Sequence, residues 1–117
     1  MLREDWLQQQ MKALSELIAR VAELLRGGQP NEALEVIRDE GVRALSADPA
    51  VLAVVDERTV FLLLGNDPKR VVRYAALVGL EADAVEASGD AATAHNLRAR
   101  AESLSEAAQR RAEEQSR

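Results

Sequence analysis

The chain of 117 residues contains no cysteine, which excludes disulfides, thiolate metal ligands and cysteine nucleophiles. Aromatic residues make up only 3% of the sequence, so Leu, Val and Ala must build the core. This composition favours close-packed helices over a β-sandwich, whose strands rely on aromatic and β-branched pairs. One histidine is present, and no motif gathers the ligands that a metal site needs. We therefore expect neither a metal nor a cofactor.

An excess of positive charge and a long apolar run are also missing. The net charge of −5 argues against a nucleic-acid binder. No apolar run approaches the ~20 residues that span a bilayer, and the first residues, "MLREDWLQQQ", lack the apolar stretch of a signal peptide. The length fits one folded domain. We expect a cytoplasmic protein with no nucleic-acid partner and no membrane partner.

Apolar residues recur in alternating steps of four and three along the first part of the chain. The stripe from Leu7 to Leu25 predicts a helix over about residues 5–26, and the Gly-Gly-Gln-Pro sequence that follows ends it. A second helix is expected to about residue 44. Asn31 is its expected N-cap, and Val42 is expected on its inner side.

The middle of the chain, residues 50–64, holds the short apolar runs "AVLAVV" and "VFLLL". Buried strands would fit them locally, but an otherwise helical chain offers nothing for strands to pair with. We expect two short helices here, the second capped by Asp56 and stopped by Gly65. The Asp-Pro pair at 48–49 suits the start of the first one.

Two long helices are expected in the last part of the chain. Asp67 and Pro68 open one that runs to about Ala87, and Asp90 caps another that follows at once. We predict an all-α fold of about six helices, in which two short helices join two helical hairpins. Residues 1–110 are expected to form one domain, and residues 111–117 a polar tail that frays.

The corner at Gly89-Asp90 carries a resemblance to a known helical pattern. Ala82 lies seven residues before this glycine, and Ala94 and Ala101 lie five and twelve residues after it. The spacing resembles that of tetratricopeptide (TPR) helix pairs, which place small residues where two helices cross closely. Gly28 and Ala33, in "GGQPNEAL", repeat the five-residue step.

Taken as a whole, the order of hairpin, intervening helices and second hairpin resembles a small bacterial family of uncharacterised TPR-like helical proteins. The two corner glycines lie 61 residues apart, whereas tandem TPR motifs recur every ~34 residues. The resemblance implies a TPR-like bundle with a protein-binding role. It implies no activity.

No arrangement of catalytic side chains emerges. His95 lies roughly 135° from the centre of the last helix's apolar face, at ~100° per residue, which predicts a solvated surface histidine. Glu102 and Glu106 lie one turn apart and are expected to be solvated, with Arg98 and Arg110 as their partners. The serines lack a nucleophile-elbow motif and the glycines lack phosphate-binding spacing. We predict no catalytic, cofactor-binding or metal residues, and no enzyme.

Cations crowd the first turns of the penultimate helix, where the helix dipole disfavours them. Asp67 could offset them while Arg73 lies over the short helices, or they could form a basic patch for an acidic segment of a partner. Trp6 either covers the edge of the core or anchors a partner. The candidate partner-binding residues are Lys69, Arg70, Arg73, Arg58 and Trp6.

These observations predict a non-enzymatic interaction or adaptor module that binds another protein. One alternative is a structural homodimer with the stripe Leu7 to Leu25 as its seam. A dimer would leave that stripe partly unmatched within one chain, whereas a monomer would cover it with its second and central helices. The other alternative is an accessory subunit that borrows its active site from an enzyme.

Overall fold

Six helices and no strand make up residues 2–116, the part of the chain that the computed structural model describes, with side chains described from residue 5. The all-α prediction is confirmed. The helices are α1 (Leu2–Arg26), α2 (Pro30–Leu45), α3 (Pro49–Leu52), α4 (Glu57–Leu63), α5 (Pro68–Ala87) and α6 (Ala91–Gln115).

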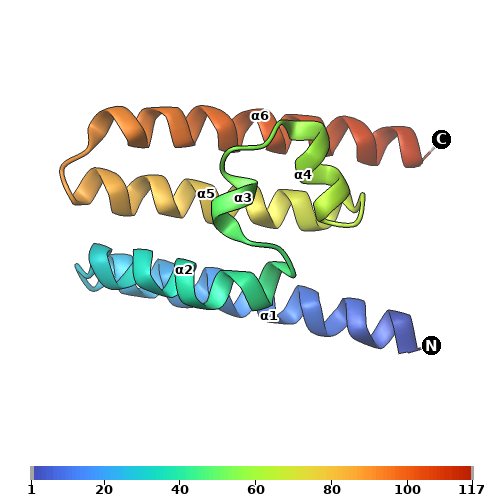
Figure 1. Cartoon of the computed structure of the whole chain (residues 1–117), viewed down its shortest axis with the longest axis horizontal. Helices are drawn as coiled ribbons and strands as arrows, with labels where there is room; N and C mark the ends of the chain where they lie inside the picture. Colours follow the sequence, from blue (N-terminus) through green and yellow to red (C-terminus); the bar gives the residue numbers. More distant parts are fainter. Residues whose placement is uncertain (1, 117) are drawn as a thin grey trace.

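The long helices form two hairpins, α1–α2 and α5–α6, which lie side by side (Figure 1). The short helices α3 and α4 lie across one side of the two hairpins and connect them. Helix α5 is central, because it packs against α6, α1, α2 and α4. The start of α1 and the end of α6 lie at the same end of the molecule, next to α4. The predicted order of two hairpins joined by two short helices is confirmed.

Aspartate caps set most of the helix starts, as the sequence predicts. In α3, α4, α5 and α6 the carboxylate before the helix accepts a hydrogen bond from a backbone N–H of the first turn, at 2.8–3.0 Å. These caps are Asp48, Asp56, Asp67 and Asp90. The prediction for α2 is wrong: the helix begins at Pro30, so Gln29 is the N-cap and Asn31 is already helical. Proline fits the first helical position because its missing N–H is not needed there.

The core is aliphatic, as the composition requires. Its fully buried members come from every helix and include Leu14, Val21, Leu52, Phe61, Leu64, Val71, Leu77 and Leu104. Val42 was expected among them, but 49% of its surface is exposed. The buried face of α2 passes through Gly41 instead, where Pro49 of α3 packs so closely that a Cβ atom on the glycine would lie 2.7 Å from the proline Cγ. The contact between α2 and α3 therefore depends on a glycine.

Two arginines anchor the short helices to the α5–α6 hairpin. Arg70 of α5 donates to the carbonyl of Leu45 at 2.6 Å and to that of Leu64 at 3.1 Å. Arg100 of α6 donates to the carbonyls of Leu52 at 2.6 Å and Val55 at 2.7 Å. These carbonyls lie at or just beyond the ends of α2, α3 and α4, where no further helical turn can satisfy them. Guanidinium groups thus fix the position of a segment whose helices are too short to be stable alone.

Helix α6 continues to Gln115, beyond residue 110, where the sequence predicted the helical domain to end. The reason is a contact that sequence patterning does not show. The guanidinium carbon of Arg111 lies 3.8 Å from the centre of the Phe61 ring in α4, within the range of a cation–π interaction. The last turns of α6 therefore have a partner in α4.

Candidate protein-docking surface

The structure does not gather the five candidate residues into one patch. Arg70 was predicted to be part of an exposed basic surface, but the structure corrects this, because only 4% of the residue is exposed. Its charge is used inside the fold, on the two carbonyls described above. Burial lowers the pKa of the Arg70 guanidinium, and the nearby Asp67 carboxylate partly opposes this shift.

Lys69 and Arg73 lie beside different elements, α6 and α1 respectively. The Nε–H of Arg73 donates to the hydroxyl of Ser15 in α1 at 3.1 Å, so the expectation that this side chain covers the short helices is wrong. Lys69 is exposed beside a groove of about 370 Å³ between α5 and α6, whose floor consists mainly of small side chains. One large apolar side chain in this groove, Val72, is partly exposed.

Trp6 lies at the edge of a larger cleft of about 550 Å³ at the end of the bundle that carries both termini. About half of the Trp6 surface, 48%, is exposed. The cleft is bounded by the first turns of α1, the end of α4, the loop to α5 and the end of α6, and its lining includes Leu7, Leu62, Leu63, Asn66, Pro68 and Gln115.

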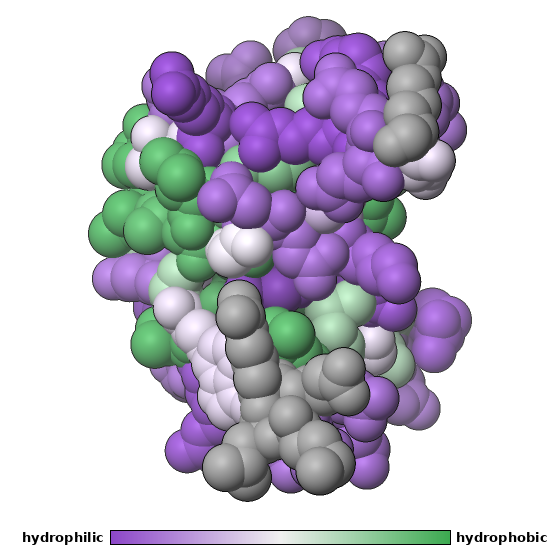
Figure 2. Space-filling model, turned by 90° about the vertical axis from the view of Figure 1, so that its right-hand side faces the viewer, coloured by the Kyte–Doolittle hydropathy of each residue, from purple (hydrophilic) through white to green (hydrophobic). Residues whose placement is uncertain are grey.

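Helix α4 presents apolar side chains to solvent beside Trp6. Leu62 is 60% exposed and Leu63 is 41% exposed. Figure 2 looks at this end of the molecule and shows hydrophobic side chains gathered on the side that carries α4. The helix has seven residues and turns Val60 and Phe61 to the core, so at ~100° per residue the next two side chains must point outward.

Sequence reasoning predicted a short helix for the run "VFLLL" but did not assign its faces, so it did not identify Leu62 and Leu63 as exposed. A usable signal was present. A helix packed on one side buries only one face, so consecutive apolar residues at all angles around it must leave some of them exposed.

Three arginines gather next to this apolar surface. Arg58 of α4 and Arg110 and Arg111 of α6 line a cleft of about 340 Å³, together with Glu57, Phe61, Ala107 and Glu114. The ion pairs found among the described side chains involve Arg20, Arg38 and Arg98, and none involves these three arginines. Sequence reasoning grouped Arg58 with Lys69, expected Arg110 to pair with a carboxylate of its own helix, and assigned Arg111 to a frayed tail.

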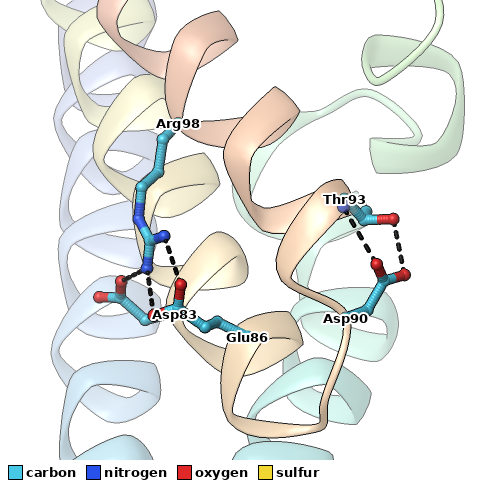
Figure 3. A network of polar contacts seen from close by, with 5 residues as sticks. All are labelled: Asp83, Glu86, Asp90, Thr93 and Arg98. Carbon is cyan, nitrogen blue, oxygen red and sulfur yellow. Dashed lines mark hydrogen bonds and ion pairs between the residues drawn. The ribbon is translucent and has the colours of Figure 1, made fainter.

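Arg98 links α5 and α6 and does not belong to the surface described above. Arg98 was expected to pair with Glu102 in its own helix, but it donates instead to Asp83 and Glu86 of α5, at 2.8–3.1 Å (Figure 3). These hydrogen bonds connect α5 and α6 near the corner of the hairpin. The hydrogen bond and the charge of Arg98 lower the pKa of Glu86 below its ordinary value. His95 is exposed.

In residues 2–116 no three His, Asp or Glu side chains are placed to hold a metal ion. No helix of that range is long and apolar enough to cross a bilayer.

The apolar stripe of α1 is partly covered within the chain, with Leu7, Met11, Ile18 and Leu25 half-buried. Leu14, Leu17 and Val21 are buried, and α1 packs against α2 and α5. A homodimer seam along α1 stays a prediction.

Comparison of the chain with protein-family models, with curated proteins and with solved structures finds no match to any of them.

Proposed function

We propose that the chain is a non-enzymatic protein-interaction module that binds a helical segment of another protein in the cleft between α1 and α4. We call the surface formed by Trp6, Leu62 and Leu63 the docking surface. The observation that carries the proposal is that these three large apolar side chains are 41–60% exposed around one cleft. Contiguous exposed apolar side chains, with an aromatic residue among them, are typical of binding sites for proteins.

The other clefts support the proposal less well. The cleft of about 450 Å³ between α1 and α2 is lined by charges of both signs and is bridged by the ion pair of Arg20 and Glu40. The groove between α5 and α6 exposes only one large apolar side chain, Val72. Neither of these clefts gathers three exposed large apolar side chains, as the docking surface does.

The docking surface is also held rigidly, which favours binding because little conformational entropy is lost. Asp56 caps the start of α4 through the backbone N–H of Thr59, at 2.8 Å. Arg70 holds the carbonyl of Leu64 just beyond the end of α4, and Phe61 and Val60 fix its inner face in the core. Covering Leu62 and Leu63 completely would contribute on the order of 2 kcal/mol, since each is already partly buried.

The resemblance to TPR-like helix pairs supports the same role, because such pairs offer helix faces to other proteins. It rests on the corners at Gly28 and Gly89, both of which have positive φ angles, +72° and +103°. We propose a TPR-like character and a cytoplasmic setting on these grounds and on those of the sequence.

A peptide selection on the purified protein tests the proposal. A display library of random 16-residue peptides is selected on the wild-type protein, and enriched peptides are synthesised. Trp6 is the only tryptophan, so its emission reports directly on the docking surface. Because a tryptophan that leaves water emits at shorter wavelength, we expect bound peptides to shift the Trp6 emission to the blue.

The matched variants are Leu62→Ser/Leu63→Ser and Val72→Ser, which removes an exposed apolar side chain from a different face. We expect the double variant to weaken binding roughly tenfold or more and the Val72 variant to leave it unchanged. Circular dichroism confirms that each variant is folded. Peptides that bind the double variant as tightly as the wild type would contradict the proposal.

A further inference from the structure

We infer that the partner segment is an acidic amphipathic helix, whose apolar face covers the docking surface and whose carboxylates meet Arg58, Arg110 and Arg111. We call these three residues the arginine cluster. The inference rests on the proposed function and names the chemistry of the partner.

The arginine cluster and the docking surface are continuous. Arg58 lies four residues before Leu62, so both side chains project from the exposed side of α4. The two clefts meet where α4 and α6 each contribute neighbouring residues: Phe61 and Glu114 line the arginine-rich cleft, and Leu62 and Gln115 line the apolar one. One helix lying along α4 would therefore contact both.

The charge of the arginine cluster is only partly balanced, because three guanidinium groups share the cleft with two carboxylates. The pKa of Asp56 is lowered mainly by its hydrogen bonds with Thr59, and the nearby charge of Arg58 lowers it further. Glu57 and Glu114 are the carboxylates that line the same cleft, and Glu57 already accepts a hydrogen bond from the hydroxyl of Ser103. None of the three guanidinium groups forms an ion pair with a side chain that the structure describes. A planar guanidinium binds a carboxylate through two parallel N–H···O bonds, so carboxylates from a partner would complete the site.

One member of the arginine cluster is already positioned. Arg111 is stacked on the ring of Phe61, which is itself buried in the core. This contact restrains the Arg111 side chain before a ligand arrives, so less side-chain entropy is lost when a carboxylate binds.

The charge of the whole chain makes this location selective. The net charge is −5, so most of the surface repels an acidic segment. An acidic helix would be attracted to the arginine cluster and disfavoured elsewhere, whereas a basic helix would be disfavoured at the docking surface. Electrostatics would thus set both the partner class and its place on the molecule.

The same peptide selection tests the inference through the composition of the enriched peptides. We expect apolar residues at helical spacing together with an excess of Asp and Glu over the starting library. In fluorescence anisotropy, Arg58→Glu/Arg110→Glu should weaken binding of an enriched peptide roughly tenfold or more at low salt, and the loss should shrink at high salt because charges are screened. Replacing the peptide's Glu residues with Gln should weaken binding to the wild type alone.

The matched control is Arg26→Glu/Arg38→Glu, which changes the net charge by the same amount at exposed positions of α1 and α2. At about 0.15 M salt, where the Debye length is about 8 Å, we expect this control to bind within about twofold of the wild type, since neither Arg26 nor Arg38 lines either cleft.

Three outcomes would overturn the inference. Enriched peptides whose binding depends on Leu62 and Leu63 but which carry no acidic excess would refute the acidic partner, while the proposed docking surface would be retained. Peptides that do not depend on Leu62 and Leu63 would refute the proposed function as well. A homodimer in sedimentation, dissociated by Leu62→Ser/Leu63→Ser, would show that a second copy of the chain occupies the surface.

Discussion

Replacing Arg70 with methionine should destabilise the protein, although it removes a buried charge. Arg70 satisfies the carbonyls of Leu45 and Leu64, which lie at the ends of α2 and α4. Each carbonyl left without a donor costs about 1–3 kcal/mol when buried. Methionine keeps much of the apolar packing of the arginine side chain and cannot donate a hydrogen bond.

An opposing effect reduces the loss. Burying a guanidinium without a paired carboxylate is unfavourable by up to several kcal/mol, and the lowered pKa of Arg70 reflects that cost. Both hydrogen bonds run from a charged donor, so we expect their loss to cost more than is gained by removing the buried charge. The expected net destabilisation is about 2 kcal/mol. In a chain of this length that corresponds to a drop in Tm of roughly 8 °C.

Urea unfolding followed by far-UV circular dichroism measures the free energy of unfolding. Arg73→Met is the matched control, since Arg73 makes a hydrogen bond to an exposed hydroxyl and its loss should cost less than about 1 kcal/mol. Hydrogen exchange gives a second measurement, because losing the anchor should speed exchange in α4 before the rest of the fold. If Arg70→Met is as stable as the wild type, Arg70 does not anchor the ends of α2 and α4 as described here.

Further variants test other parts of the fold. Gly41→Ala should destabilise by about 1–2 kcal/mol, because its Cβ would lie 2.7 Å from the proline ring of α3, whereas Gly79→Ala, which has open space, should stabilise by about 0.5–1 kcal/mol; equal effects in urea unfolding would refute the close contact. Gly89→Leu should cost about 1 kcal/mol or more, because φ is +103°, while His95→Ala should change the Tm little; equal Tm values would mean that the corner is misassigned. Burial raises the pKa of Glu81 above 4.5, so the contribution of this group to stability is complete below the unfolded-state pKa and is lost as pH rises through the folded-state value. Glu81→Gln should therefore raise the Tm relative to the wild type at pH 7 but not at pH 4, and an equal difference at both pH values would contradict the assignment.

Local signals in the sequence predicted most of the fold. The apolar periodicity located the long helices, and the aspartates at Asp48, Asp56, Asp67 and Asp90 marked four helix starts, because a cap acts on its own first turn. Asn31 failed as a cap because Pro30 was already able to begin the helix.

The errors concern residues whose surroundings depend on how distant segments pack. Val42 is exposed because Pro49 packs on Gly41 instead. Arg70 is buried because the ends of two helices supply carbonyls at the place where its side chain lies. No periodicity in one segment contains this information.

The candidate site was predicted only in part. Trp6 and Arg58 were identified as candidates from residue type alone, and the structure places them at neighbouring clefts of the same end. Arg111 was missed because its partner, Phe61, lies 50 residues earlier in the chain and belongs to a helix that the sequence defines poorly.

The docking surface is the central claim, and amide chemical-shift mapping tests it most directly. The ¹⁵N-labelled protein is titrated with an enriched peptide, and the shift of each backbone amide is followed. We predict changes confined to α4, the first turns of α1 and the last turns of α6, including the side-chain N–H of Trp6. Changes centred on the α1–α2 cleft or on the Gly28 and Gly89 corners, with α4 unaffected, would contradict the account.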